Sequence, residues 1–173
     1  MSWTIIALLT ALLGYLIYLY NRLVSLKNQA LAAWSDIDVQ LKRRHELIPK
    51  LVDAVRQYTA YEQSTLTAVT ELRLQSERLD DPSSKGRLES DLGQAMQRLI
   101  AVAEQYPVLK ANQNFLSLQQ DISAIEGDIQ HARRYYNGSI RLLNTRIDSF
   151  PDLLIARLFG FRYGPYFQLE EDK

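Results

Sequence analysis

The chain has 173 residues, enough for one domain of ordinary size, and its 20 Lys+Arg are balanced by 20 Asp+Glu. A net charge of zero argues against a nucleic-acid binder, because such proteins present an excess of basic residues to phosphates. The chain has no cysteine, which excludes disulfides, thiolate metal sites and cysteine nucleophiles together.

Residues 3–20 form an apolar stretch that carries no charge at neutral pH. As a helix it would be roughly 27 Å long, close to the ~30 Å hydrocarbon thickness of a bilayer. We expect this span to be retained, because no Lys or Arg precedes it and no small-x-small cleavage site follows it. We therefore predict a membrane anchor over residues 1–21, with these interfacial residues: Trp3, Tyr15, Tyr18, Tyr20 and Arg22.

The basic residues that flank this span all follow it, with Arg22 and Lys27 nearest to its end. Positively charged flanks tend to stay in the cytoplasm. We therefore expect the C-terminal domain to be cytoplasmic.

Beyond the span, apolar residues recur at alternating spacings of three and four, which predicts helix almost throughout. Residues 112–149 show the longest stripe and predict a helix of about 57 Å, which needs partners of comparable length. Shorter stripes occupy residues 23–41, 51–72 and 88–106, and residues 80–86 predict a loop. The long stripe consists of Phe115, Leu118, Ile122, Ile125, Ile129, Ala132, Tyr136, Ile140, Leu143, Ile147 and Phe150.

Pro49 decides how many helices the chain has. A proline inside a helix removes one backbone hydrogen bond and clashes with the preceding turn, whereas a first turn accepts it. We predict that one helix ends near residues 43–45 and the next begins near Pro49, with a kink in one continuous helix as the alternative. Residues 22–158 then form an all-α, antiparallel up-and-down four-helix bundle that ends in a short helix over residues 153–158.

Residues 36–46 are rich in charged side chains, with six Asp, Glu, Lys or Arg among 11 residues. Asp38 and Lys42, like Gln40 and Arg44, are four residues apart and share a helix face. One interpretation is a solvated helix end that pairs with itself, and the other is a docking surface for a partner or a neighbouring copy. The candidate interaction residues of this run are Asp36, Asp38, Lys42, Arg43, Arg44 and His45.

The chain offers no constellation typical of catalysis or metal binding. Its two histidines, His45 and His131, lack the Glu three residues earlier that di-iron bundles use. Glu62 lies on the apolar line between Tyr58 and Leu66, where a carboxylate needs a donor. We expect it to form an ion pair with an arginine of another helix, and we predict no catalytic residue, metal or cofactor.

Residues 159–173 form an aromatic tail, too interrupted by Gly and Pro for a helix and too aromatic for a free linker. It either folds back to cap one end of the bundle or adheres to another copy, a partner or the membrane surface. Its candidate residues are Phe159, Phe161, Tyr163, Tyr166 and Phe167.

Several segments in order along the chain carry a family resemblance. They include residues 20–24, 33–45 and 47–49, Tyr106-Pro107, Phe150-Pro151 and Gly160-Phe161. On these motifs the chain resembles the LemA family of bacterial membrane-anchored helical proteins. The resemblance implies an N-terminal anchor in the bacterial inner membrane, a four-helix bundle, no established enzymatic activity and association with membrane-protein partners.

We therefore expect a membrane-anchored scaffold or adaptor that self-associates or organises membrane-protein partners. The alternative is an accessory or regulatory subunit of a membrane protease or another membrane enzyme. We expect no nucleic-acid partner and see no sign of a small-molecule substrate.

Overall fold

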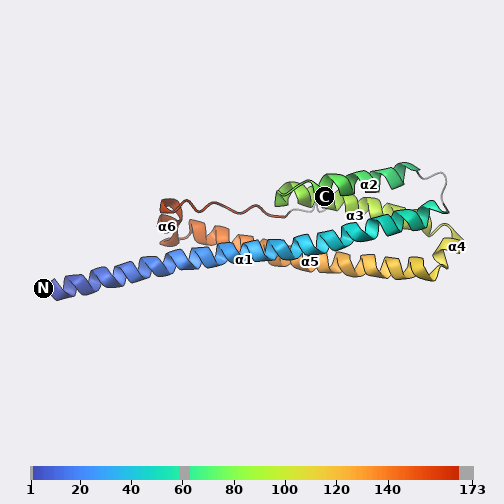
Figure 1. Cartoon of the computed structure of the whole chain (residues 1–173). Helices are drawn as coiled ribbons and strands as arrows, with labels where there is room; N and C mark the ends of the chain where they lie inside the picture. The colour runs from blue at the N-terminus through green and yellow to red at the C-terminus, as the bar shows by residue number, and fades with distance from the viewer. Residues whose placement is uncertain (1, 59–62, 168–173) are drawn as a thin grey trace.

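The computed structural model describes residues 2–58 and 63–167, and these fold into helices without any strand. The elements, in chain order, are α1 (Ser2–Arg56), α2 (Gln63–Glu77), α3 (Pro82–Ala103), α4 (Pro107–Lys110), α5 (Gln113–Asp148) and α6 (Asp152–Leu158) (Figure 1). The prediction of an all-helical chain is confirmed.

The long helices lie side by side and reverse direction at each connection (Figure 1). α5 returns along α1, and the α2–α3 hairpin lies along the part of α1 that is distant from the N-terminus. α6 stands at the opposite end of α5, and the chain then runs back toward the hairpin. The first part of α1 extends alone beyond all the other elements.

This projecting part of α1 is the predicted apolar anchor. Its 18-residue window has a mean hydropathy of 1.9 and is only 6% buried, so by length and composition it can cross a membrane. Trp3, for example, is 85% exposed. Leu19 is the first buried residue of α1, which means that packing against the rest of the chain begins where the apolar run ends.

The core follows α1 and α5 as three clusters of buried side chains. Leu19 and Leu23 pack with residues of α5 and α6 nearest the apolar run. A second cluster, around Ile37 and Tyr136, joins the middle of the two helices. The third and largest cluster includes side chains of α2 and α3, so the hairpin is attached at the distal end.

The predicted helix boundaries around Pro49 are wrong. α1 continues through Pro49 to Arg56, so the helix does not break near residues 43–49. Proline inside a helix costs about 3 kcal/mol, but Leu47, Ile48, Leu51, Val52 and Val55 are all buried on either side of it. Each of these side chains contributes ~1.5–3 kcal/mol by burial, and the exposed Pro49 lies away from the core, so continuation of the helix is favoured.

The loop predicted over residues 80–86 is also shorter than expected. α3 already begins at Pro82, with Asp81 as its N-cap accepting a hydrogen bond of 2.8 Å from the Ser84 amide. Aspartate before a proline at the first helical position is a favourable helix start. Residues 83–86 are therefore helical.

α5 matches the helix predicted over residues 112–149. Asn112 caps it by accepting hydrogen bonds from the amides of Asn114 and Phe115. The buried stripe runs from Phe115 to Ile147, and Phe150, which we expected to continue it, is 80% exposed. Phe150 lies beyond the helix end, where the spacing of a helix no longer determines its direction.

Candidate functional site

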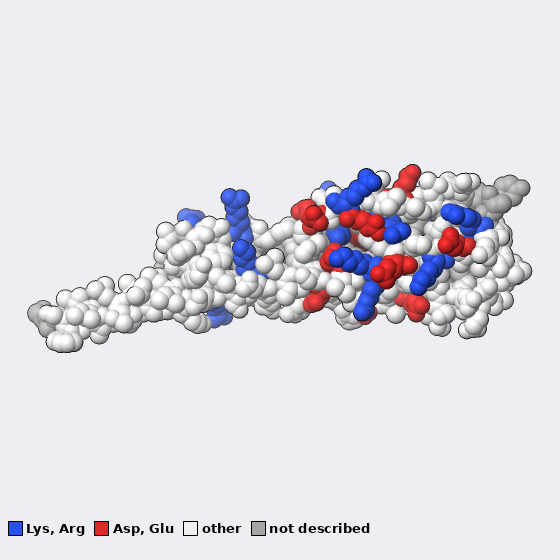
Figure 2. All heavy atoms as spheres, viewed as in Figure 1, with Lys and Arg blue, Asp and Glu red and all other residues white. Residues whose placement is uncertain are grey.

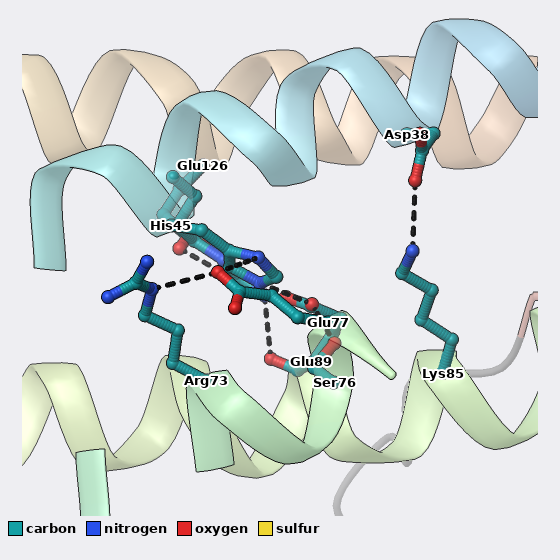
Figure 3. A network of polar contacts seen from close by, with 9 residues as sticks. Asp38, His45, Arg73, Ser76, Glu77, Lys85, Glu89 and Glu126 are labelled. Carbon is teal, nitrogen blue, oxygen red and sulfur yellow. Dashed lines mark hydrogen bonds and ion pairs between the residues drawn. The ribbon is translucent and has the colours of Figure 1, made fainter. Parts of the chain in front are cut away.

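A buried cluster of charged side chains joins α1 to α3 and α5. Glu89 of α3 is at its centre and has a fully buried side chain. Arg44 of α1 forms an ion pair with one carboxylate oxygen of Glu89, and His45 Nε2 lies 2.7 Å from the other oxygen. Ser76 of α2 donates a hydrogen bond to that second oxygen (Figure 3).

Arg44 also connects the cluster to α5. Its Nη1 donates to Glu126 Oε1 at 2.8 Å, and its Nη2 donates to the backbone carbonyl of Glu89 at 2.9 Å. One guanidinium group therefore bonds to side chains of two other helices. The planar fork of arginine suits this kind of bridging.

A second ion pair crosses between α1 and α3 at some distance from the first (Figure 3). Lys85 Nζ lies 2.9 Å from Asp38 Oδ1, and Lys42 Nζ lies 2.7 Å from Asp38 Oδ2. Burial favours a higher pKa for Asp38, but the hydrogen bonds from Lys42 and Lys85 prevail and the pKa is lowered. The two ion pairs, Arg44–Glu89 and Asp38–Lys85, fix the register of α3 against α1.

The electrostatics of the cluster keep Glu89 ionised. Burial on its own raises the pKa of Glu89, yet the hydrogen bond from His45 and the charge of Arg44 outweigh it and bring the pKa to about 2. A general acid or base works best with a pKa near the operating pH. Glu89 therefore fits a structural ion pair better than proton transfer.

The described residues contain no group of three or more His, Asp or Glu side chains that could hold a metal ion. The donors around Glu89 are directed at its own carboxylate and leave no oxygen free for a ligand. This cluster can therefore lock helices together but offers little for chemistry.

A groove of about 830 Å³ lies on the surface between α1, α5 and the tail. It begins beside Tyr20, at the end of the apolar run, and extends to Trp34 and Pro82. Its lining is mainly apolar, and the charged residues that line it, Lys27 and Arg162, are both basic. Such a concave apolar surface with few polar groups is typical of a binding site.

The tail forms one wall of this groove because polar side chains of α5 hold its backbone. Asn137 exchanges two hydrogen bonds with Phe167, at 3.0 and 2.9 Å, and Asn144 does the same with Gly164. Tyr136 donates its hydroxyl to the Pro165 carbonyl at 2.8 Å, and burial, supported by the charge of Asp81, raises the pKa of Tyr136 to about 12. The tail thus lies back along its own helices.

The structure separates the predicted tail residues into two groups. Phe167 is buried beside Trp34, and Phe161 is half-buried, so these two rings belong to the core. Phe159, Tyr163 and Tyr166 remain exposed.

The charged residues predicted to form an interaction surface, within residues 36–46, also fall into two groups, those at least partly exposed and those that are buried. Asp36, Lys42 and Arg43 are exposed, and Asp38 is half-buried. Arg44 and His45 are only 2% and 5% exposed, so they do not lie on a docking surface or at a solvated helix end. They are directed inward because a buried carboxylate on α3 provides their partner.

Gln40 and Glu62 are two further residues that the sequence singled out. Gln40 does not pair with Arg44, and its Oε1 has no hydrogen-bond partner among the described residues. Glu62 lies outside the described residues. The buried carboxylate that pairs with an arginine of another helix is Glu89.

The sequence reasoning missed Glu89, Ser76 and Glu126. For Glu89 a signal exists, because the buried positions of α3 repeat at spacings of four and three. That stripe is Lys85, Glu89, Leu92, Met96, Leu99 and Ala103. Two charged residues on a buried stripe indicate partners on a facing helix.

These observations define a class of protein: an all-helical chain with a candidate membrane span at its N-terminus, a helical domain locked by buried ion pairs, and a groove beside the span. Comparison with known proteins gives the family. The LemA family model matches residues 33–173, and the chain belongs to that family.

Similarity to named proteins extends over most of the chain. Protein LemA of Metamycoplasma hominis is 29% identical over 167 residues, covering 95% of this chain and 76% of its own length. The magnetosome protein MamQ of Magnetospirillum gryphiswaldense is 25% identical over 185 residues, covering 92% of this chain and 68% of its own length. MamQ 2 of Paramagnetospirillum magneticum is also 25% identical, over 184 residues. None of these names describes a catalytic activity.

Proposed function

We propose that this protein is a membrane-anchored scaffold or adaptor without catalytic activity of its own, which holds membrane-protein partners beside its anchor. The observation that carries this proposal is the groove, because it opens at Tyr20, where the apolar run of α1 ends. A partner helix that leaves the bilayer next to α1 would reach the groove directly.

The lining of the groove favours a particular kind of partner. Leu31, Trp34 and Leu143 provide apolar surface, which gains free energy when it is removed from water. Two basic residues line the groove: Lys27 on α1, seven residues after Tyr20, and Arg162 at the start of the tail. The best occupant is therefore an apolar helix with an acidic residue close to the membrane.

The helical domain is suited to presenting this groove. We interpret α1, α2, α3 and α5 as an antiparallel four-helix bundle, with Arg44 and Glu89 fixing the relative positions of three of them. The basic residues that follow the apolar run favour a cytoplasmic location of this domain at a bacterial inner membrane.

The experiment compares two exposed leucines of the full-length chain. Leu31 is 55% exposed and lines the groove, whereas Leu74 is 45% exposed on α2 and lies outside it. The chain and its Leu31→Lys and Leu74→Lys variants are isolated from native membranes in lipid nanodiscs. Native mass spectrometry then measures the composition of each particle.

We expect a membrane protein to co-purify with the unaltered chain and with Leu74→Lys, and to be lost from Leu31→Lys. Loss of a second copy in the same pattern would show that the groove serves homo-oligomerisation. Particles that hold a single chain in all three preparations would contradict the scaffold proposal.

A further inference from the structure

The short helix α6 and its flanking residues expose several large apolar side chains. Leu154 and Leu158 are four residues apart on α6 and are 57% and 76% exposed, and Phe150, two residues before α6 begins, is 80% exposed. Phe159 adds a ring that is 57% exposed. Four large, exposed apolar side chains within ten consecutive residues are rare on a soluble surface unless lipid or a partner covers them. We call these four residues the apolar foot.

The apolar foot lies at the level where the apolar run of α1 ends. Ile155 and Ala156, on the other side of α6, belong to the buried cluster that contains Leu19 and Leu23 of α1. The rings of Phe159 and Tyr20 pack with centroids 4.7 Å apart. Tyr20 is the last residue of the apolar run, so the foot is placed at the boundary between the hydrocarbon and the headgroups.

The charges around the foot have the sign that a membrane surface requires. Residues 19–28 and 141–162, which form this end of the domain, contain six Lys or Arg and two Asp, a net charge of +4. Of the two acids, Asp152 is buried and paired with Arg146, and Asp148 accepts a hydrogen bond from Tyr163. On the face shown in Figure 2, only basic groups stand over this end, whereas both signs alternate over the distal part.

We propose that the apolar foot inserts into the interface of an anionic membrane, so that the helical domain rests on the bilayer at a second point besides its anchor. Apolar side chains enter the boundary between headgroups and acyl chains, while Arg157 and the neighbouring cations contact anionic headgroups. This inference depends on the membrane anchor. Phe159 also lines the groove, but Phe150, Leu154 and Leu158 do not, so the inference does not require a partner in the groove. Its consequence is a fixed tilt and rotation of the domain relative to the membrane.

The natural absence of cysteine makes a direct test available, because a single introduced cysteine gives a unique label. A nitroxide spin label is attached to full-length Leu158→Cys and, separately, to Val108→Cys on α4 at the distal end. Both side chains are highly exposed, at 76% and 69%, so neither substitution disturbs packing. The proteins are reconstituted in vesicles of phosphatidylcholine with phosphatidylglycerol, and collision rates are measured with oxygen, which concentrates in lipid, and with a water-soluble nickel chelate.

We expect the ratio of oxygen to nickel collisions to be several-fold higher at residue 158 than at residue 108. The ratio at residue 158 should fall when phosphatidylglycerol is omitted, and when Arg157→Gln is added. A nickel accessibility at residue 158 equal to that at residue 108 would overturn the proposal. So would a label at residue 158 shielded from both reagents with spin–spin broadening, because a second copy would then cover the foot. These vesicles contain no other protein, so the result is independent of the proposed scaffold function.

Discussion

Replacing Glu89 by Gln tests the role of the buried ion pairs in the helical domain. The side chain of Glu89 is fully buried, and donors from Arg44, His45 and Ser76 are directed at its two oxygens. Glutamine keeps the size but replaces one oxygen with an NH₂ group, which would face at least one of these donors. The variant therefore leaves a buried arginine with only partial compensation from Glu126.

Breaking a buried ion pair by removal of one charge typically costs ~3–5 kcal/mol. Whole domains of this size are stable by only ~5–15 kcal/mol, so Glu89→Gln should lower the thermal midpoint markedly. Circular dichroism of the full chain in nanodiscs measures this midpoint. The matched control is Glu46→Gln, because Glu46 is exposed on the same segment of α1 and should change stability by less than ~0.5 kcal/mol.

The pH dependence provides a second measure of the same residue. The folded state lowers the pKa of Glu89 from 4.5 to about 2, so the stabilisation from its ionised form is present above pH 4.5 and is lost as the pH falls toward about 2. The difference in stability between the unaltered chain and Glu89→Gln should therefore shrink over this acidic range. An unchanged midpoint in Glu89→Gln at neutral pH would refute the reasoning.

Three further substitutions test the packing of α5 and the tail. Ile129→Asp, at a position only 2% exposed, should place an uncompensated charge between α1 and α5 and cost ~3–5 kcal/mol, and an unaltered melting curve would show that the helices do not pack there. Asn112→Ala removes the N-cap of α5 and should cost about 1 kcal/mol in denaturant unfolding, with no effect expected if the cap is not formed. Asn137→Ala removes both hydrogen bonds to Phe167 and should cost ~1–3 kcal/mol, with faster proteolysis of the tail, and an unchanged cleavage rate would argue against this docking.

The elements that the sequence predicted well are those in which local and tertiary preferences agree. α5 has an uninterrupted apolar stripe and an asparagine cap, so its bounds could be predicted to within one residue. The apolar run of α1 could be predicted equally well, because crossing a membrane requires length and apolarity rather than a particular packing partner.

Pro49 shows why the remaining bounds could not be predicted. The local cost of a proline inside a helix is clear from the sequence, but the gain from burying residues 47–55 depends on α2, α3 and α5 being in place. The tertiary gain is larger, and it is not visible within the segment itself.

For a similar reason, only part of the buried cluster around Glu89 could be predicted from the sequence. The run at residues 36–46 showed charged side chains at helical spacing, but the direction of Arg44 depends on Glu89, 45 residues further along the chain. The groove depends on the path of the tail, which Asn137 and Asn144 determine through bonds to the backbone. An isolated asparagine within a helical sequence does not indicate that it will bind the backbone of a distant segment.

The most direct test of the proposed function is photo-crosslinking in intact cells of the native host. A photoreactive amino acid is placed at residue 31, inside the groove, or at residue 74, outside it, in the full-length chain. The scaffold proposal predicts a discrete adduct with a membrane protein, or with a second copy, from residue 31 and none from residue 74. No adduct from residue 31, or the same adducts from both residues, would contradict it.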